Sequence, residues 1–123
     1  MLRTVFYYKI DNGNYVADMK HKYIVNIADQ AKQCSNISRI VLFGSALETR
    51  CTDKSDIDIA VFGEESKAKY LRSKEFKDFQ RRLFTFGDSF HQNYDILYFC
   101  NSQTTNDAIM GDIDKGAEIY RRT

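Results

Sequence analysis

The sequence lacks a long uninterrupted apolar run, a closely spaced cysteine pair and a surplus of charge of either sign. Because no apolar run approaches the roughly 20 residues that cross a bilayer, the sequence predicts no membrane-spanning helix. The N-terminus has no extended apolar segment, since Lys9 and Asp11 interrupt it, and no secretion signal is predicted. We therefore expect a cytoplasmic protein.

Cysteine and histidine are scarce. The three cysteines, Cys34, Cys51 and Cys100, are widely spaced and form no Cys-x-x-Cys pair, which argues against structural zinc and against a disulfide framework. We expect free thiols in a reducing compartment. Because the chain has 2 histidines, a histidine-rich metal centre is excluded.

Charge is nearly balanced, with 18 Lys and Arg residues against 17 Asp and Glu residues. A net charge of +1 provides no general attraction to nucleic acid or to anionic lipid, so neither is an expected partner. The 123 residues, of which 43% are hydrophobic, fit one domain with one core. We expect a single domain over residues 1–123, and homo-oligomerisation stays open.

The spacing of apolar residues predicts a mixture of strands and helices. Aromatic and β-branched residues around the Asn12-Gly13 turn predict an N-terminal β-hairpin over residues 2–16. Apolar residues at helical spacing predict helices over residues 19–34, 66–84 and 103–115. Strands are predicted at residues 40–43, 55–62, 94–99 and 118–120.

Two acids, Asp56 and Asp58, alternate with isoleucines in one predicted strand. Strand periodicity places both carboxylates on one face, about 7 Å apart. Like charges so close repel each other unless a cation lies between them, and Mg²⁺ is held by one or two carboxylates together with substrate phosphates. The pair therefore predicts a Mg²⁺ site. Asp95, near the start of a later strand, is a third candidate, with a solvated strand face as the alternative.

The turn Gly44-Ser45 follows the apolar strand at residues 40–43. A glycine lets the backbone approach a ligand closely, and exposed N–H groups with a serine hydroxyl can bind phosphate oxygens. Such a turn is common by itself, but here ten residues separate Ser45 from the Asp56-x-Asp58 pair. We expect the complete pattern to arise by chance in about one chain of this length in a thousand.

This pattern, Gly44-Ser45, ten residues and Asp56-x-Asp58 with a strand on each side, resembles the signature of the polymerase-beta-type nucleotidyltransferases. The small size is similar to that of the minimal nucleotidyltransferases, or MNT domains, and Asp95 fills the position of the family's third acid. The resemblance implies an α+β fold, in which a mixed β-sheet packs against helices as in the polymerase-beta palm.

The resemblance also implies a reaction, the transfer of AMP from ATP to an acceptor hydroxyl with release of pyrophosphate. In this interpretation Asp56, Asp58 and Asp95 are the catalytic residues and hold two Mg²⁺ ions. Gly44 and Ser45 would contact the β- and γ-phosphates of the nucleoside triphosphate.

The loop after this turn departs from the family pattern. Many members have an arginine soon after Gly-Ser, where this chain continues with Ala46-Leu47-Glu48-Thr49. Arg50 is the candidate replacement in nucleotide binding. The departure concerns nucleotide affinity and acceptor choice and leaves the three acids in place.

MNT domains of this kind act as antitoxins that adenylylate a tyrosine of a partner toxin, typically a HEPN ribonuclease, and the resemblance implies such a partner here. Two alternatives stay open. One is a small-molecule nucleotidyltransferase, as in aminoglycoside resistance, although such enzymes usually carry an extra helical domain. The other is a non-catalytic binding subunit that neutralises its partner by docking, against which the intact set of three acids argues.

Overall fold

The computed structural model describes residues 7–11, 14–47, 51–102 and 108–122. In chain order its elements are β1 (Tyr7–Asp11), β2 (Asn14–Ala17), α1 (Asp18–Ala31), β3 (Ile37–Phe43), the 3-10 turn η1 (Gly44–Leu47), β4 (Ile57–Gly63), α2 (Lys67–Tyr70), α3 (Lys74–Asp88), β5 (Tyr94–Cys100), α4 (Ala108–Asp114) and β6 (Ala117–Arg121). In this part of the chain, no helix combines the length and the apolar character needed to cross a membrane.

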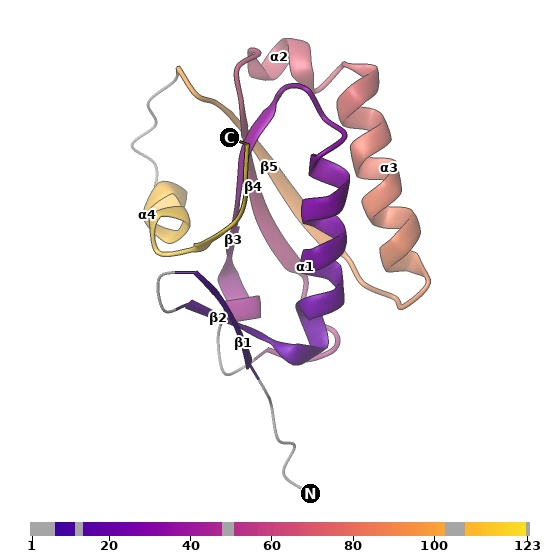
Figure 1. The fold of residues 1–123 in the computed structure, drawn as a ribbon, viewed down its shortest axis with the longest axis vertical. Helices are drawn as coiled ribbons and strands as arrows, with labels where there is room; N and C mark the ends of the chain where they lie inside the picture. Colours follow the sequence, from indigo (N-terminus) through magenta and orange to yellow (C-terminus); the bar gives the residue numbers. More distant parts are fainter. Residues whose placement is uncertain (1–6, 12–13, 48–50, 103–107, 123) are drawn as a thin grey trace, which may run out of the picture.

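A four-stranded mixed sheet of order β5-β4-β3-β6 forms the centre of the molecule (Figure 1). β4 runs parallel to β5 and antiparallel to β3, and β6 is antiparallel to β3. β1 and β2 pair as a separate antiparallel sheet, and β2 contacts η1 at the end of β3. The predicted α+β fold with a mixed sheet packed against helices is therefore confirmed.

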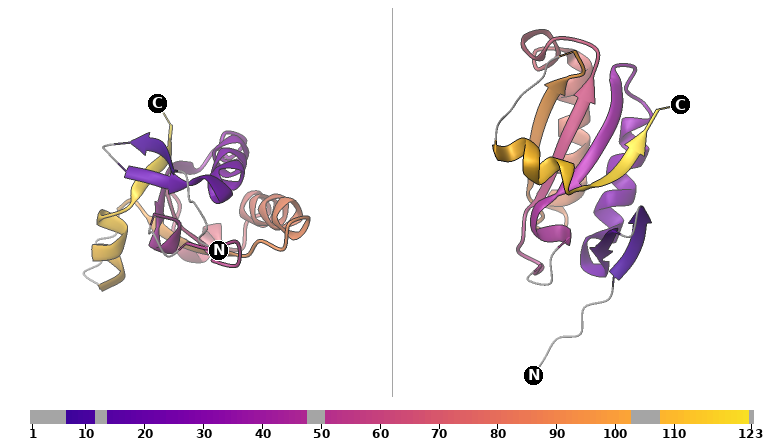
Figure 2. Two further views of the ribbon diagram at one scale, coloured as in Figure 1. Left: turned by 90° about the horizontal axis from the view of Figure 1, so that it is seen from below. Right: turned by 90° about the vertical axis from the view of Figure 1, so that its left-hand side faces the viewer.

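Helices cover both faces of this sheet, with α1 and α3 on one side and α4 on the other (Figure 2). Along β3, Ile40 and Leu42 join the core under α1 and α3, whereas Val41 and Phe43 join the core under α4. Because both faces are buried, residues 40–43 form an unbroken apolar run rather than an alternating pattern.

One predicted helix is wrong, because residues 66–84 form two helices instead of one. Ser66 and Ser73 each have extended backbone, and their side chains accept hydrogen bonds from the N–H groups of Lys69 and Phe76. Each serine therefore caps the start of a helix. Because Ser73 begins a new helix, α2 and α3 are separated at residues 71–73. The predicted helix over residues 103–115 lies partly outside the described residues, and its described part is α4.

Glu75, in the first turn of α3, holds the turn between α1 and β3. Its carboxylate accepts hydrogen bonds from Ser35 N (2.7 Å), Ser35 Oγ (2.9 Å), Asn36 N (3.1 Å) and the Tyr70 hydroxyl (2.7 Å). Burial alone would raise the pKa of Glu75, but the hydrogen bonds from Tyr70, Ser35 and Asn36 outweigh it and lower the pKa.

We expect Glu75→Gln to lower the stability of the protein at neutral pH. The cost should be about 1 kcal/mol, which is less than is usual for a hydrogen bond to a charged group, because the carboxylate is only half-buried. Since the folded-state pKa lies below the unfolded one, this stabilisation is fully present above the unfolded pKa of about 4.3 and is lost as pH falls through the folded pKa. Thermal melts should show the difference between variant and wild type narrowing below that pH.

The control for this variant is Glu65→Gln, because Glu65 makes a surface ion pair with Lys69 at 3.7 Å and should cost at most about 0.5 kcal/mol. If the melting temperature of Glu75→Gln equals that of wild type at neutral pH, the Glu75 carboxylate does not stabilise the turn between α1 and β3.

Candidate active site

The three predicted acids meet at one end of the sheet, where β3 ends and where β4 and β5 begin. Asp58 is the second residue of β4 and Asp95 the second residue of β5, and the parallel register pairs the two directly. On the other side of Asp58 its partner is Phe43, the last residue of β3. Because neighbouring strands lie about 4.8 Å apart, this register sets the two acids and the end of β3 side by side.

Both paired acids lie on the face of the sheet that α4 covers. Asp58 alternates along β4 with Ala60 and Phe62 of the core under α4. Asp95 alternates in the same way along β5 with Leu97 and Phe99, which pack against that core. Since every second residue of a strand has the same facing, the two carboxylates are directed to one side.

Asp56 has a different position from the one predicted. The ladder of β4 begins at Ile57, so the predicted strand over residues 55–62 starts two residues too early. The physical reason is that the carbonyl of Ser55 accepts hydrogen bonds from two side chains, those of Lys20 and Gln92, rather than from a neighbouring strand. Asp56 is therefore an exposed residue immediately before the first residue of β4.

The electrostatics of this group are those of crowded like charges. Asp58 is half-buried, whereas Asp56 and Asp95 are exposed. Burial raises the pKa of Asp58, and the nearby charges of Asp95 and then Asp56 raise it further. Each ionised neighbour therefore makes ionisation of Asp58 harder, and a bound cation would relieve this repulsion.

Gly44 makes room for the Asp58 carboxylate. The residue has φ of +81°, a conformation that side chains with a Cβ rarely adopt. A Cβ at Gly44 would overlap Oδ2 of Asp58. The next residue but one, Ala46, is fully buried in the main core and anchors the turn, and Ser45 between them is half-buried. Arg50 lies outside the described residues.

A cavity of about 450 Å³ opens beside Gly44 and Asp58. Its wall includes Asp112 of α4 and Lys115, which lies between α4 and β6. Sequence reasoning missed both residues, because they are more than fifty positions from the Asp56-x-Asp58 pair. For Lys115 the available signal was its place in a segment where a predicted helix, Gly116 and a predicted strand follow one another.

The residues at this site fit a Mg²⁺ ion that takes some of its ligands from the protein and the others from a substrate and water. Among the described residues, no three His, Cys, Asp or Glu side chains form a group that could hold a metal ion by themselves. Mg²⁺ needs only one or two carboxylates when phosphate oxygens and water complete its shell. Asp58 and Asp95, paired across adjacent strands, provide that number.

Comparison with known proteins agrees with this geometry. The family model described as Polymerase beta, Nucleotidyltransferase matches residues 25–123. The match contains the Gly44-Ser45 turn, all three acids and the cavity residues Asp112 and Lys115, and it leaves out β1 and β2. The comparison with curated proteins gives no match.

Proposed function

The chain belongs to the polymerase-beta nucleotidyltransferase family, and from this premise we propose that it transfers AMP from ATP to a hydroxyl group in a Mg²⁺-dependent reaction. One observation supports the proposal most strongly, namely the direct pairing of Asp58 with Asp95 beside the Gly44 turn. This pairing sets two carboxylates side by side, and one of them, that of Asp58, lines a cavity together with Gly44.

The acids take distinct roles in this reaction. Asp56 and Asp58 would hold the metal ions, and Asp95 would complete the second metal site. When bound, Mg²⁺ stabilises the charge on the attacking and leaving oxygens of an in-line displacement. The acceptor oxygen forms a bond to the α-phosphorus, the bond to the bridging oxygen of pyrophosphate breaks, and the hydroxyl proton passes to exposed Asp95.

The Gly44 turn and Lys115 would serve the phosphates. The N–H groups of the Gly44-Ser45 turn beside Asp58 would donate to phosphate oxygens, and the Ser45 hydroxyl is a further donor. Lys115 contributes the positive charge of the cavity wall that contains Asp58. These groups position charge, which is the protein's main contribution to phosphoryl chemistry.

We propose that the acceptor is a tyrosine on a partner protein, by resemblance a HEPN toxin. The cavity of about 450 Å³ has the size of a single ligand site, so a bound nucleotide leaves little enclosed space for a small acceptor. Asp95 is exposed and therefore accessible to a hydroxyl presented by another protein. This arrangement favours a protein antitoxin over an aminoglycoside-type enzyme.

ATP binding should depend on a divalent cation. Without metal, the carboxylates of Asp56, Asp58 and Asp95 repel the triphosphate, so calorimetric titration in EDTA should show no appreciable affinity. The same titration with Mg²⁺ or Mn²⁺ should show clear binding. Equal affinity in the two buffers would count against the proposed site.

The acceptor can be identified with the protein encoded by the neighbouring gene. The two proteins are incubated with labelled ATP and Mg²⁺, then digested and analysed by mass spectrometry. We expect an AMP-modified tyrosine on the partner that is absent with the Asp56→Ala/Asp58→Ala variant. An unmodified partner together with efficient labelling of an aminoglycoside would instead establish the small-molecule activity.

A further inference from the structure

Two buried polar side chains, those of Lys20 and Gln92, lie close to the segments that carry the acids. Lys20, in the first turn of α1, has an exposed fraction of 1%, and Gln92, just before β5, has one of 2%. They are the buried polar or charged side chains among the residues whose burial the structure describes. A buried ammonium group is costly unless it is well hydrogen-bonded, so its retention calls for an explanation.

The Lys20 ammonium makes a complete set of hydrogen bonds. Its Nζ donates to the carbonyl of Asp53 at 3.2 Å, to the carbonyl of Ser55 at 2.6 Å and to Oε1 of Gln92 at 2.5 Å. The three donors of a lysine are thereby used. Burial lowers the pKa of Lys20, while the charges of Cys51, Asp53 and Asp56 act in the opposite direction.

Gln92 extends the same network to the second acid-bearing strand. Its Nε2 donates to the carbonyl of Ser55 at 3.0 Å and to the carbonyl of Asn93 at 2.6 Å. The carbonyl of Asn93 also accepts from Ile57 N at 3.1 Å. The pair therefore ties the residue before Asp56 to the segment that ends two residues before Asp95.

We propose that Lys20 and Gln92 are positioning residues that set Asp56 and Asp95 at the separation that metal binding requires. The inference rests on the proposed function, because it assigns the pair a role in holding ligands for the metal–ATP complex. Neither side chain would contact a reacting atom. Both act through the backbone of residues 53–57 and 93, which fixes the starts of β4 and β5.

The direction in which one substitution changes Mn²⁺ affinity distinguishes a positioning role from a simple charge effect. Lys20→Met removes the ammonium but keeps an unbranched apolar side chain that fits a buried site. If Lys20 acted only as a nearby positive charge, its removal would strengthen the binding of Mn²⁺ to the acids, since like charges repel. If Lys20 positions the acids, its removal weakens Mn²⁺ binding.

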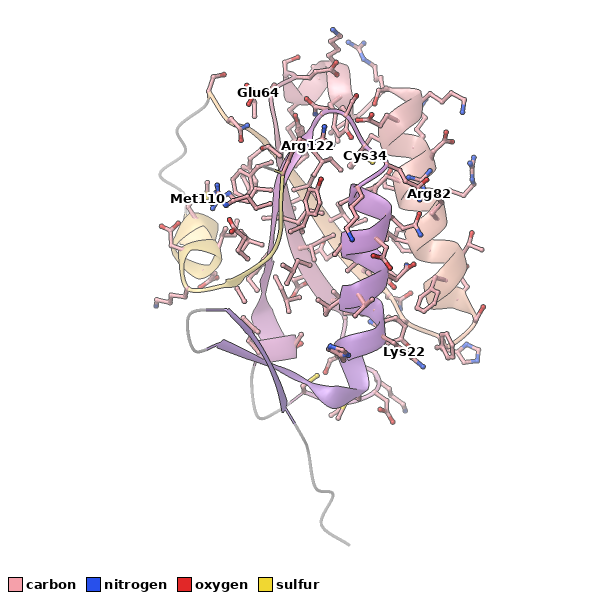
Figure 3. The ribbon with its side chains drawn as sticks, viewed as in Figure 1. Lys22, Cys34, Glu64, Arg82, Met110 and Arg122 are labelled. Atoms are coloured by element: carbon pink, nitrogen blue, oxygen red, sulfur yellow. The ribbon has the colours of Figure 1, made fainter. Side chains whose placement is uncertain are left out.

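Lys22→Met is the matched control. Lys22 lies two residues further along the same helix, near its lower end in Figure 3. Its side chain is exposed, with Nζ 3.4 Å from the centre of the Phe90 ring. The control removes the same charge from α1 without touching the network. Gln92→Met is a second test variant, because it removes the acceptor for Lys20 and the donor to Ser55 and Asn93 without adding a charge.

The experiment measures Mn²⁺ binding in the presence of ATP by calorimetry, at a temperature where thermal melts show each variant to be folded. We expect Lys20→Met and Gln92→Met to weaken Mn²⁺ binding by about tenfold or more, as supporting residues of metal sites do. Lys22→Met should stay within about twofold of wild type, because surface charges are screened.

Two results would overturn the inference, and they differ in what they say of the proposed function. Unchanged or tighter Mn²⁺ binding by folded Lys20→Met, or by folded Gln92→Met if the first variant does not fold, would remove the positioning role alone. Absence of Mn²⁺–ATP binding by wild type would remove the proposed function and the inference together.

Discussion

Asp58→Asn should lower the rate of nucleotidyl transfer by about a thousandfold or more, because it removes one of the groups that stabilise the charge of the reaction. Asn keeps the shape of the side chain and one oxygen, so the change tests the charge of the carboxylate. The rate is measured as AMP incorporated into the acceptor at saturating ATP and Mg²⁺. Asp29→Asn, at an exposed position on α1, should leave the rate unchanged.

The same substitution should not destabilise the metal-free protein. Burial and the charges of Asp95 and Asp56 raise the folded-state pKa of Asp58, so its ionised form disfavours folding at pH values above that pKa. Asp58→Asn removes that charge, and the melting temperature in EDTA should be equal to that of wild type or slightly higher. The rise in melting temperature on adding Mg²⁺ and ATP should be lost. A fall of many degrees would make Asp58 a structural residue.

Gly44→Ala should combine a loss of stability with a loss of nucleotide binding. A residue with a Cβ at φ of +81° costs roughly 1–2 kcal/mol in the left-handed region. The new methyl group would also displace the Asp58 carboxylate, whose Oδ2 occupies its place. We expect binding of Mg²⁺–ATP, measured by calorimetry below the melting temperature, to weaken by about tenfold or more.

Gly111→Ala provides the matched control for this variant. Gly111 is an exposed residue of α4, and a Cβ there would meet no heavy atom within 4 Å. Because alanine favours helix over glycine by up to about 1 kcal/mol, this control should be as stable as wild type or more so, with normal nucleotide binding. Normal binding by Gly44→Ala would contradict the proposed contact between the turn and the acids.

The strands at the centre of the sheet were predictable because both of their faces are buried, so that successive residues are apolar. Residues 40–43 form a short apolar run that ends at a glycine turn, which is typical of a strand covered on both faces. Asp58 and Asp95 were predictable as site candidates because ionised groups in such strands need a partner. Their direct pairing was not, because the parallel register of β4 and β5 depends on tertiary packing.

Helix boundaries were less predictable, and the break between α2 and α3 shows the cause. Ser73 lies within an otherwise helical spacing of apolar residues, and its capping bond to Phe76 outweighs that periodicity. Lys20 escaped prediction for a related reason. A lysine near a helix start is typical of a solvated position, and its carbonyl partners at Asp53 and Ser55 lie more than thirty residues away.

The proposed nucleotidyl transfer is tested most sharply by comparing ATP labelled at the α-phosphorus with ATP labelled at the γ-phosphorus, in the presence of Mg²⁺ and the protein encoded by the neighbouring gene. Nucleotidyl transfer retains the α-phosphorus on the acceptor and releases the γ-phosphorus in pyrophosphate. We therefore predict that the α-label, and not the γ-label, becomes covalently bound to the partner, and that Asp58→Asn abolishes this incorporation. Incorporation of the γ-label, or α-label incorporation that survives Asp58→Asn, would contradict nucleotidyl transfer at Asp58.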